Sequence, residues 1–437
     1  MDDKKSLITA PEAVKTANLY KRTFIKVKKV LRILGPGLIT GASDDDPSGI
    51  ATYSQAGAQF GFSVLWTAFI TFPLMAAVQG MCARIGIVTS QGLTVTIKNN
   101  YPRVLLYVML ILSFPAITLN IGADLQGIGA VSHMIIPFIP VSVFCIFFTA
   151  ILMYIIIKYP YKKIAMILKW LCLSLLVYII VPFLTKQDWG LIAKSTFIPS
   201  IKLDKEYLSI IVAILGTTIS PYLFFWQTTM EVEENKNNNR VMINKRVLTD
   251  MRKDVNIGML LSNVVMFFII LTTATVLYTS GIRSIVTVDQ AAKALEPLAG
   301  KLTYLIFALG IISTGVLAIP VLAGSQSYML AETFGWKTGL DKKFPKAKAF
   351  YITIIFSLLV GLSLDFFEAS PIKALYYTAI LYGLTAPFLI AVVLLISNNK
   401  KIMKEHTNSL FSNILGFITL ILMSGAALAL IYFEIKG

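Results

Sequence analysis

The 437-residue sequence is poor in cysteine and histidine, with three and two of them respectively. Cys82, Cys145 and Cys172 lie far apart in apolar stretches and form no CxxC pair, which argues against a disulfide framework and a thiolate metal site. His133 and His406 lie near the ends of apolar stretches. Imidazole ligands and imidazole acid–base chemistry are therefore scarce in the interior.

Charged residues are also scarce, at 14% of the sequence, whereas 56% of residues are hydrophobic and the mean hydropathy is +0.74. Soluble domains carry about 25% charged residues. Apolar stretches long enough to cross a bilayer recur along the chain and leave little for a soluble domain. The basic N-terminus lacks the apolar core and cleavage site of a signal peptide. We therefore predict an all-α, polytopic integral membrane protein without a cleaved signal.

The apolar stretches predict eleven membrane spans, centred near residues 47, 74, 117, 149, 173, 219, 266, 312, 357, 384 and 421. With the N-terminus in the cytoplasm, thirty of the 39 lysines and arginines fall in the inner segments 1–32, 84–103, 158–169, 236–253, 337–348 and 400–404. This basic excess is the usual orientation signal and predicts an external C-terminus. The net charge of +16 therefore indicates the phospholipids of the cytoplasmic membrane as a partner, and not nucleic acid.

The first predicted span is interrupted by a polar run from Gly41 to Gly49, in which Asp44, Asp45 and Asp46 precede a proline. A charge in the middle of a span commonly costs a few kcal/mol and is rare without a function. Proline removes a backbone donor and leaves carbonyls of the preceding turn free. Carboxylates and free carbonyls at one depth suit a cation. Asp46 also has the position of a helix cap, and the two roles are compatible.

The sixth span carries a matching interruption, a run of small polar residues that ends in Pro221. Pro47 and Pro221 are 174 residues apart, and each opens a block of five spans. Because five spans reverse the orientation of the next five, this pattern indicates an inverted repeat with a substrate site at the midplane. The predicted regions are a basic cytoplasmic N-terminus (1–30), two five-span repeats (31–185 and 206–397) and an eleventh span (409–434).

Both interruptions and their flanks resemble the Nramp family of divalent-metal transporters, which share the LeuT-type fold. The resemblance covers the ten repeat spans and the eleventh, and it rests on Gly35-Pro36-Gly37 leading to Asp46-Pro47, on Leu215-Gly216 through Pro221, on Ala123-Asp124-Leu125, and on Ala323-Gly324-Ser325-Gln326 through Glu332. It implies a LeuT-type 5+5 inverted repeat that imports divalent cations by alternating access. No enzyme activity is implied.

This sequence differs from the family pattern at positions where the resemblance implies metal ligands. The family's first-span motif is Asp-Pro-Gly-Asn, whose aspartate and asparagine bind the metal; this chain keeps Asp46 but has Ser48 and Gly49 after the proline. In the sixth span the family supplies a backbone carbonyl and a methionine, and the corresponding residues here are Thr217 and Ser220. With no Met, Cys or His in either break, oxygen ligands favour Mg²⁺ or Mn²⁺ over softer metals.

The short side chains at Gly49 and Ser220 also predict a larger cavity. Mg²⁺ loses its waters reluctantly and usually binds through one or two carboxylates, so a roomier site suits a partly hydrated ion. This pattern resembles the Nramp-related magnesium transporter branch. The predicted metal site comprises Asp46, Gly49, Thr217 and Ser220, and no cofactor is expected beyond the transported Mg²⁺ or Mn²⁺. The hydroxyls of Thr217 and Ser220 have the alternative role of repairing the broken helix.

Further polar residues are predicted to line a vestibule or to surround the metal ligands, namely Asp44, Asp45, Ser48, Tyr222, Asp124 and Gln326. Three consecutive residues at a helix end point about 100° apart, so the three aspartates are not expected to face one site. Asp124, with Asn120 and Gln126 near it, has the alternative role of joining helices through hydrogen bonds. Joining helices is the favoured role for Gln326.

The residues around the site also predict transport without proton coupling. The resemblance implies a proton route through a histidine after the sixth-span proline, acids on the third span and an arginine on the ninth. This chain has Tyr222 and Gly127 at two of these positions, and no basic residue from Phe350 to Phe366. A tyrosine ionises only near about pH 10. Only Asp46 and Asp124 remain as titrating groups of the route.

Three alternative functions are open. The first is a proton-coupled Mn²⁺ or Fe²⁺ transporter, against which the missing methionine argues. The second is a transporter of amino acids or other organic substrates on the same fold, which the three acids at the first break disfavour. The third is an intramembrane metal-dependent enzyme, and the absence of an HExxH pair argues against it.

Overall fold

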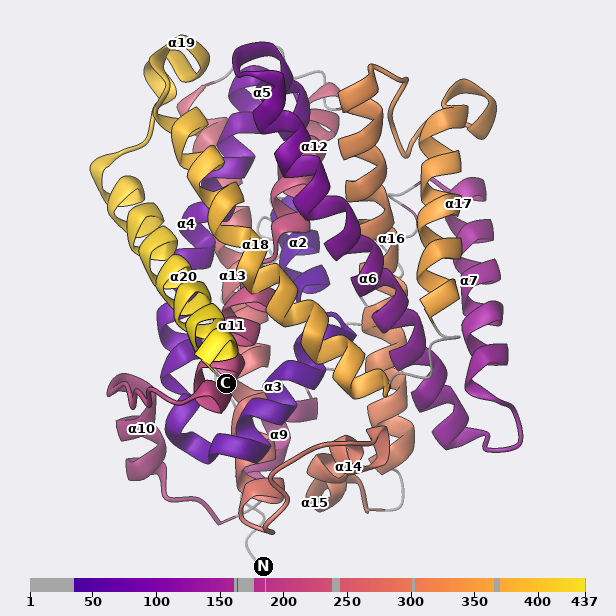
Figure 1. Cartoon of the computed structure of the whole chain (residues 1–437), viewed down its shortest axis with the longest axis vertical. Helices are drawn as coiled ribbons and strands as arrows, with labels where there is room; N and C mark the ends of the chain where they lie inside the picture. The colour runs from indigo at the N-terminus through magenta and orange to yellow at the C-terminus, as the bar shows by residue number, and fades with distance from the viewer. Residues whose placement is uncertain are drawn as a thin grey trace, which may run out of the picture.

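The computed structural model describes residues 35–160, 163, 177–184, 186–237, 244–300, 303–364 and 370–436. Within these ranges the regular elements are helices, and the long helices run side by side in one bundle (Figure 1). Eight of the described helical stretches are long and apolar enough to cross a membrane, as judged by length and composition, if the two helices between Lys205 and Lys236 are counted as one span. This confirms the predicted all-α membrane architecture.

The first predicted repeat corresponds to a run of helices that begins with a broken one. The elements are α2 (Pro36–Asp44), α3 (Pro47–Phe60), η1 (Gly61–Val64), α4 (Trp66–Thr89), α5 (Leu93–Asn100), α6 (Arg103–Ile135), α7 (Val141–Lys158) and α9 (Val177–Leu184). The centre of the predicted fifth span, near residue 173, lies outside the described residues, and α9 follows it. The halves of the broken helix are each too short to count among the eight long helices.

The second predicted repeat and the eleventh span follow the same order as the prediction. The long elements are α11 (Lys205–Thr218), α12 (Pro221–Asn237), α13 (Lys245–Thr273) with its π-helical extension η3 (Ala274–Tyr278), α16 (Thr303–Phe334), α17 (Lys348–Ser363), α18 (Pro371–Asn398) and α20 (Leu410–Lys436). The short connecting elements are α10 (Trp189–Phe197), α14 (Val288–Ala292), η4 (Lys293–Leu295), α15 (Glu296–Ala299), η6 (Phe344–Lys346), α19 (Lys400–Met403) and η8 (Lys404–His406).

Connecting segments predicted to share a side of the membrane gather at the same end of the bundle. Figure 1 shows α5 and α19, both predicted to be inner, at one end, and α10, α14 and α15, predicted to be outer, at the other. An ion pair between Lys205 and Glu434 (2.9 Å) ties the end of α20 to the start of α11. This arrangement agrees with the alternating direction of successive spans, and the assignment of the two ends to cytoplasm and exterior stays a prediction.

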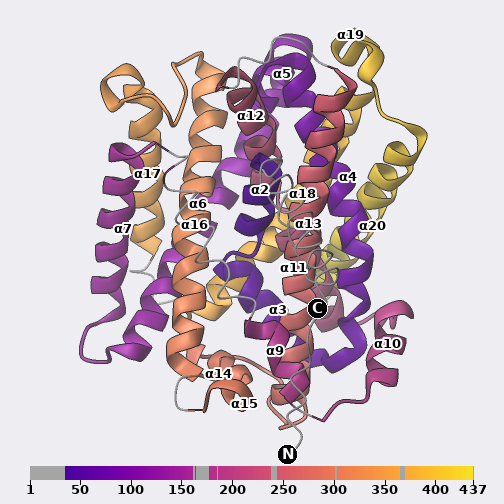
Figure 2. The same cartoon turned by 180° about the vertical axis from the view of Figure 1, so that it is seen from behind.

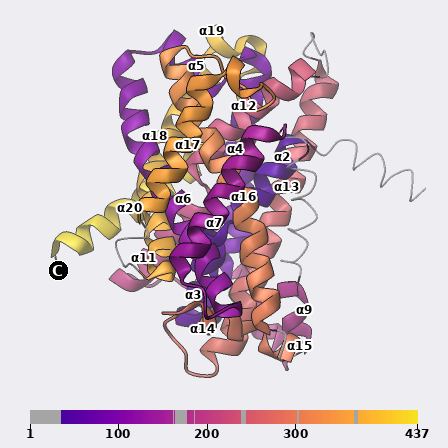
Figure 3. The ribbon, with the colours of Figure 1, turned by 90° about the vertical axis from the view of Figure 1, so that its right-hand side faces the viewer.

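The helices at the periphery expose apolar side chains to their surroundings. α20 leans on the outside of the bundle, and its C-terminal end projects from it (Figure 3). Ile421 and Leu428 of α20 are each 67% exposed, and Phe147 of α7 is 55% exposed. A surface of this kind is stable against lipid, where no polar partner is available.

The break between α2 and α3 arises from the sequence that was predicted to cause it. α2 ends at Asp44, and the backbone of Asp46 is extended, with φ −70° and ψ 173°. The Asp46 carboxylate accepts the backbone N–H of Gly49 at 2.7 Å. Pro47 is the first residue of α3, where its missing N–H removes no helical bond. Asp46 and Pro47 therefore end one half-helix and begin the next.

The break between α11 and α12 has the same length. Ile219 and Ser220 separate the two halves, and Pro221 begins the second. The Ser220 hydroxyl donates to the carbonyl of Thr217 (2.6 Å) and also lies 3.2 Å from that of Gly216. Both predicted interruptions are thus confirmed, two residues wide in each case.

Glycines let the broken helices approach their neighbours until the backbones touch. A Cβ atom on Gly41 of α2 would lie 2.2 Å from the carbonyl oxygen of Gly258 in α13, and one on Gly216 of α11 would lie 2.1 Å from that of Ala379 in α18. Small residues at such crossings are the usual means of close helix packing in membranes. Figure 2 shows α2, α11 and α13 in the middle of the bundle, with α7, α16 and α17 to one side and α4 and α20 to the other.

Candidate metal site at the two helix breaks

Tyrosines connect the two helix breaks across the middle of the bundle. The Tyr222 hydroxyl of α12 donates to the carbonyl of Ser43 at the end of α2, at 2.8 Å. The Tyr53 hydroxyl of α3 lies 3.2 Å from Thr218 Oγ1 at the end of α11. All four residues are buried. The two breaks, which are distant in the sequence, are therefore adjacent in the structure.

Gly49 and Thr217, two of the predicted metal residues, face each other across the breaks. A Cβ atom on Gly49 would lie 3.3 Å from Thr217 Oγ1 and 3.2 Å from the carbonyl oxygen of Asp44. The extra space predicted at Gly49 is therefore not present in this conformation. The physical reason is that a residue without a side chain lets the half-helices close up to van der Waals contact.

Asp46, the principal predicted ligand, has both carboxylate oxygens engaged. Oδ1 accepts the N–H of Gly49, and Oδ2 accepts the side-chain N–H of Asn120 from α6 at 3.0 Å. Its exposed fraction is 2%. The capping role predicted for Asp46 is therefore observed. Asn120 is a neighbour that the sequence placed near Asp124 and not near Asp46.

Asp44 and Asp45 face a different helix from Asp46. The Ser262 hydroxyl of α13 is 2.8 Å from Asp44 Oδ2 and 3.3 Å from Asp45 Oδ1. This confirms that the three aspartates do not face one point. Ser262 was not predicted, because a single serine in an apolar helix gives no signal beyond its polarity.

Asp124 lies on the α6 side of the first break, one turn from Asn120. Asn120 Nδ2 is 3.5 Å from Asp124 Oδ2, the long limit of a hydrogen bond. Asp124 is fully buried. Asn120 therefore lies between Asp46 and Asp124 and touches both carboxylates.

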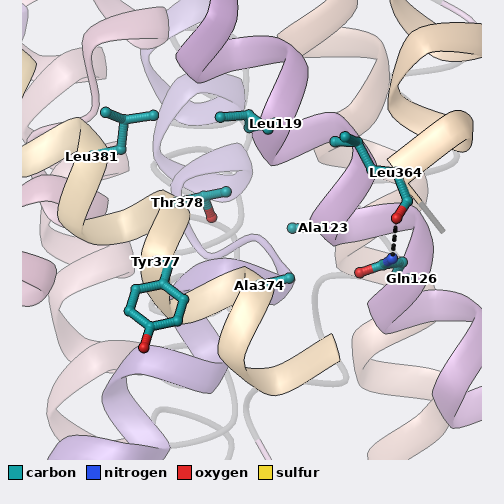
Figure 4. Close-up of a pocket in the computed structure, with 8 residues that line it drawn as sticks. All are labelled: Leu119, Ala123, Gln126, Leu364, Ala374, Tyr377, Thr378 and Leu381. Atoms are coloured by element: carbon teal, nitrogen blue, oxygen red, sulfur yellow. Dashed lines mark hydrogen bonds between the residues drawn. The ribbon is translucent and has the colours of Figure 1, made fainter. Parts of the chain in front are cut away.

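Gln126, grouped with Asp124 in the sequence, faces elsewhere. Its side-chain N–H donates to the carbonyl of Leu364 at 3.1 Å. It lines a cavity of about 320 Å³ between α6 and α18, together with Leu119, Ala123, Leu364, Ala374, Tyr377, Thr378 and Leu381 (Figure 4). The lining is mostly carbon and contains no carboxylate, so this cavity is unsuited to a cation. The helix-joining role predicted for this region applies to Gln126.

Hydrogen bonds assign structural roles to several of the other predicted residues. The Gln326 side-chain N–H donates to the carbonyl of Phe114 (3.0 Å) and to Thr118 Oγ1 (2.5 Å), which joins α16 to α6. The Ser220 hydroxyl donates to the end of α11, so the helix-repair alternative is the one observed for it. Tyr222 joins the two breaks and packs its ring on Tyr382, with centroids 5.8 Å apart.

Several buried oxygens around the first break have no hydrogen-bond partner among the described residues: Asp44 Oδ1, Ser48 Oγ, Asn120 Oδ1 and Asp124 Oδ1. Described ion pairs lie elsewhere, between Lys205 and Glu434, Arg246 and Asp250, and Glu405 and His406. A buried carboxylate without a positive partner is strongly disfavoured. The arrangement is therefore electrostatically suited to a cation.

One thioether lies beside the sixth-span break, although none lies within it. Met266 of α13 accepts a hydrogen bond from Thr218 Oγ1 at 3.6 Å and lies 3.9 Å from Thr71 Oγ1. It follows Ser262 by one helical turn on the same face of α13. This sulfur could not be placed near the site from the sequence, because the contact joins α13 to α11.

The chain is similar over nearly its whole length to known membrane transporters. It is 26% identical to a divalent metal cation transporter MntH of Caldanaerobacter subterraneus subsp. tengcongensis, over 96% of this chain and 97% of that protein. It is 24% identical to a divalent metal cation transporter MntH of Staphylococcus saprophyticus, over 91% of each chain.

Solved structures share the fold. The manganese transporter of Eremococcus coleocola superposes with a TM-score of 0.71 at 18% identity, over 92% of this chain and 86% of the other. Mhp1, a nucleobase-cation-symport-1 family transporter, superposes with a TM-score of 0.56 at 12% identity, over 92% and 93%.

These likenesses, with the two broken helices, define a LeuT-type membrane protein and confirm the predicted fold class. The profile described as natural resistance-associated macrophage protein-like matches residues 37–433, so the chain belongs to the Nramp family.

Proposed function

We propose that this protein imports a divalent metal cation by alternating access, with Mg²⁺ as the preferred ion and Mn²⁺ tolerated. The observation that carries the proposal is the cluster of buried oxygens at the first break. Four of them, on Asp44, Ser48, Asn120 and Asp124, have no hydrogen-bond partner among the described residues, and none of these side chains, nor the neighbouring Asp46, takes part in a described ion pair. The names of the relatives, divalent metal cation transporters, support the ion class.

The chemistry of the available ligands supports Mg²⁺. Asp46 neutralises part of the charge, and backbone carbonyls at the ends of α2 and α11 supply neutral oxygen. Hard oxygen ligands suit Mg²⁺ and Mn²⁺, whereas thioether and thiolate ligands favour softer ions. No group of three or more His, Cys, Asp or Glu side chains in the described ranges converges on one point. A cation at Asp46 would therefore complete its shell with carbonyls, amide oxygen and water, which suits an ion that keeps several waters.

Transport without proton coupling is the second part of the proposal. The Tyr222 hydroxyl donates to the Ser43 carbonyl, so its proton is held by a backbone acceptor, which supports this part of the proposal. Gly127 has no side chain, and Leu375 and Pro47 occupy the space next to it, within 3.5 Å of where its Cβ atom would lie. The membrane potential favours entry of a divalent ion by about 4.6 kcal/mol at 100 mV, inside negative, so accumulation needs no proton gradient.

A second candidate, a proton-coupled Mn²⁺ transporter, is favoured by two observations. The structural relative from Eremococcus coleocola is a manganese transporter, and the Met266 thioether lies beside the sixth-span break. It is disfavoured by the hydrogen bonds that Met266 already accepts and by the residues that replace the proton route.

Uptake into proteoliposomes tests the proposal. Purified protein is reconstituted with a Mg²⁺-sensitive dye inside, and uptake is measured with Mg²⁺, Mn²⁺, Cd²⁺ and amino acids outside. We expect saturable Mg²⁺ uptake at millimolar concentration and weak inhibition by Cd²⁺. Inhibition by Cd²⁺ at low micromolar concentration would favour the second candidate, a proton-coupled Mn²⁺ transporter. Uptake of amino acids without uptake of any metal ion would refute both metal-transport functions.

A further inference from the structure

Asn120 of α6 lies between two carboxylates at the first break. Its side-chain N–H₂ donates to Asp46 Oδ2 at 3.0 Å and lies 3.5 Å from Asp124 Oδ2. None of the three side chains is more than 2% exposed. The amide nitrogen therefore holds together two acidic groups that would otherwise repel each other in a medium of low dielectric constant.

The oxygen of the same amide has no partner. Asn120 Oδ1 is buried without a hydrogen bond within the described chain, and the same is true of Asp124 Oδ1. Leaving a buried acceptor unsatisfied costs about 1–3 kcal/mol. This acceptor belongs to the same amide group whose nitrogen contacts Asp46, so a turn of that group is enough to bring an unused oxygen to the proposed metal ligand.

We infer that Asn120 is a direct ligand of the transported cation, supplied by the third span, an inference that rests on the function proposed above. Amide and carboxylate oxygens are typical ligands of Mg²⁺, Ca²⁺ and Mn²⁺. A half turn of the amide about its last side-chain torsion exchanges oxygen and nitrogen with almost no change of shape. Asn120 presents its N–H₂ group to the carboxylates when no cation is bound, and its oxygen when a cation lies at Asp46.

Through this exchange Asn120 is expected to have one role in the empty site and another in the occupied site. The N–H₂ group stabilises the empty site, and the oxygen adds a ligand without adding charge. A neutral ligand holds a divalent ion less tightly than a third carboxylate, which favours release during transport. The ligand set then spans α3, α6 and the sixth-span break.

The two roles open to Asn120 predict opposite effects of its removal. If Asn120 only donates to the carboxylates, its loss leaves them closer to bare charges, and the affinity for a cation stays the same or rises. If its oxygen binds the ion, its loss lowers the affinity. Asn120→Leu has nearly the same shape as asparagine and removes both polar atoms, so it separates the two.

The experiment measures Mg²⁺ uptake into proteoliposomes and Mg²⁺ binding by calorimetry, with full-length wild type, Asn120→Leu, Asn120→Asp and Gln126→Leu. Gln126→Leu is the matched control, because this amide lies on the same helix and bonds to Leu364 away from the breaks. We expect Asn120→Leu to raise the KM and the Kd for Mg²⁺ by about tenfold or more, because the ion loses one oxygen ligand and about 1.4 kcal/mol corresponds to tenfold in affinity. Asn120→Asp restores an oxygen and recovers binding, and Gln126→Leu matches wild type.

Wild-type binding and uptake separate the inference from the proposed function. If wild type neither binds nor transports Mg²⁺ or Mn²⁺, the function fails and the inference with it. If wild type transports and the KM of Asn120→Leu is unchanged or lower, the inference alone is overturned. Should Asn120→Leu not fold, Asn120→Ala takes its place with the same two outcomes. Monodispersity and melting temperature without metal report folding.

Discussion

At the scale of single residues, the three aspartates of the first break have separate environments. Asp46 contacts Gly49 and Asn120, whereas Asp44 and Asp45 share the hydroxyl of Ser262. A consecutive run of acids therefore divides into one residue directed to α6 and two directed to α13. Asp44 and Asp45 share one hydrogen-bond donor, the Ser262 hydroxyl. If one of the two carboxylates is removed, the other still accepts this hydrogen bond.

Removal of the Asp46 charge is expected to abolish transport. Loss of one partner from a buried charge pair costs about 3–5 kcal/mol, which is more than about a hundredfold in affinity. Asp46→Asn keeps the shape of the side chain, so Mg²⁺ uptake into proteoliposomes should fall to background at normal expression. Asp44→Asn and Asp45→Asn should lower uptake less. Normal uptake by Asp46→Asn would mean that the cation binds elsewhere.

Ion preference is expected to follow the ligands that the two breaks offer. Gly49→Asn with Ser220→Met adds an amide and a thioether to the breaks. Because the thioether is a soft ligand that favours Cd²⁺, the concentration of Cd²⁺ that inhibits Mg²⁺ uptake should fall by about tenfold or more. The new side chains must first separate half-helices that now touch at Gly49. Met266→Leu is the control for the existing sulfur and should leave the Cd²⁺ sensitivity of the wild type unchanged. A clear effect of Met266→Leu would identify this thioether as a ligand.

At the scale of helices, α2 is attached to the bundle by its N-terminus. Asp254 of α13 accepts the backbone N–H groups of Gly35 (2.8 Å), Gly37 (2.7 Å) and Leu38 (3.2 Å). These are N–H groups that a helix cannot satisfy within itself, and a carboxylate there also complements the helix dipole. Asp254 therefore fixes the first half-helix, and with it Asp44 and Asp46, against α13.

Loss of this cap is expected to loosen α2. Asp254→Ala leaves three backbone donors unsatisfied and should lower stability by about 1–3 kcal/mol, seen as a lower melting temperature of the purified protein. Asp250→Ala on the same helix is the control, because its 3.9 Å contact to Arg246 lies at the exposed surface, where ion pairs contribute little. Equal melting temperatures for the two variants would contradict the capping role.

At the scale of the whole molecule, transport is expected to follow the electrochemical gradient of the ion alone. In proteoliposomes with a pH-sensitive dye and a clamped potential, Mg²⁺ uptake should leave the internal pH unchanged. Each 60 mV of inside-negative potential should favour entry by about 2.8 kcal/mol for a divalent ion. Acidification in proportion to uptake would show proton coupling and overturn this expectation.

Features of the fold that depend on residues close together in the chain could be predicted from the amino-acid pattern. Long apolar stretches gave the spans, and the prolines at 47 and 221, each preceded by small or acidic residues, gave both breaks at the observed positions. A proline acts on its own helix through its missing N–H donor and its ring, so its effect can be predicted without knowledge of the rest of the fold.

Which side chains meet at the breaks could not be predicted from the chain and is known only from the folded structure. Asn120 donates a hydrogen bond to Asp46, which is 74 residues away in the sequence, and Ser262 donates one to Asp44, which is 218 residues away. These contacts depend on how whole helices are rotated and how closely they cross, and glycines such as Gly41 and Gly49 allow the closest approaches. The orientation of a helix is set by packing against all of its neighbours, which no local pattern contains.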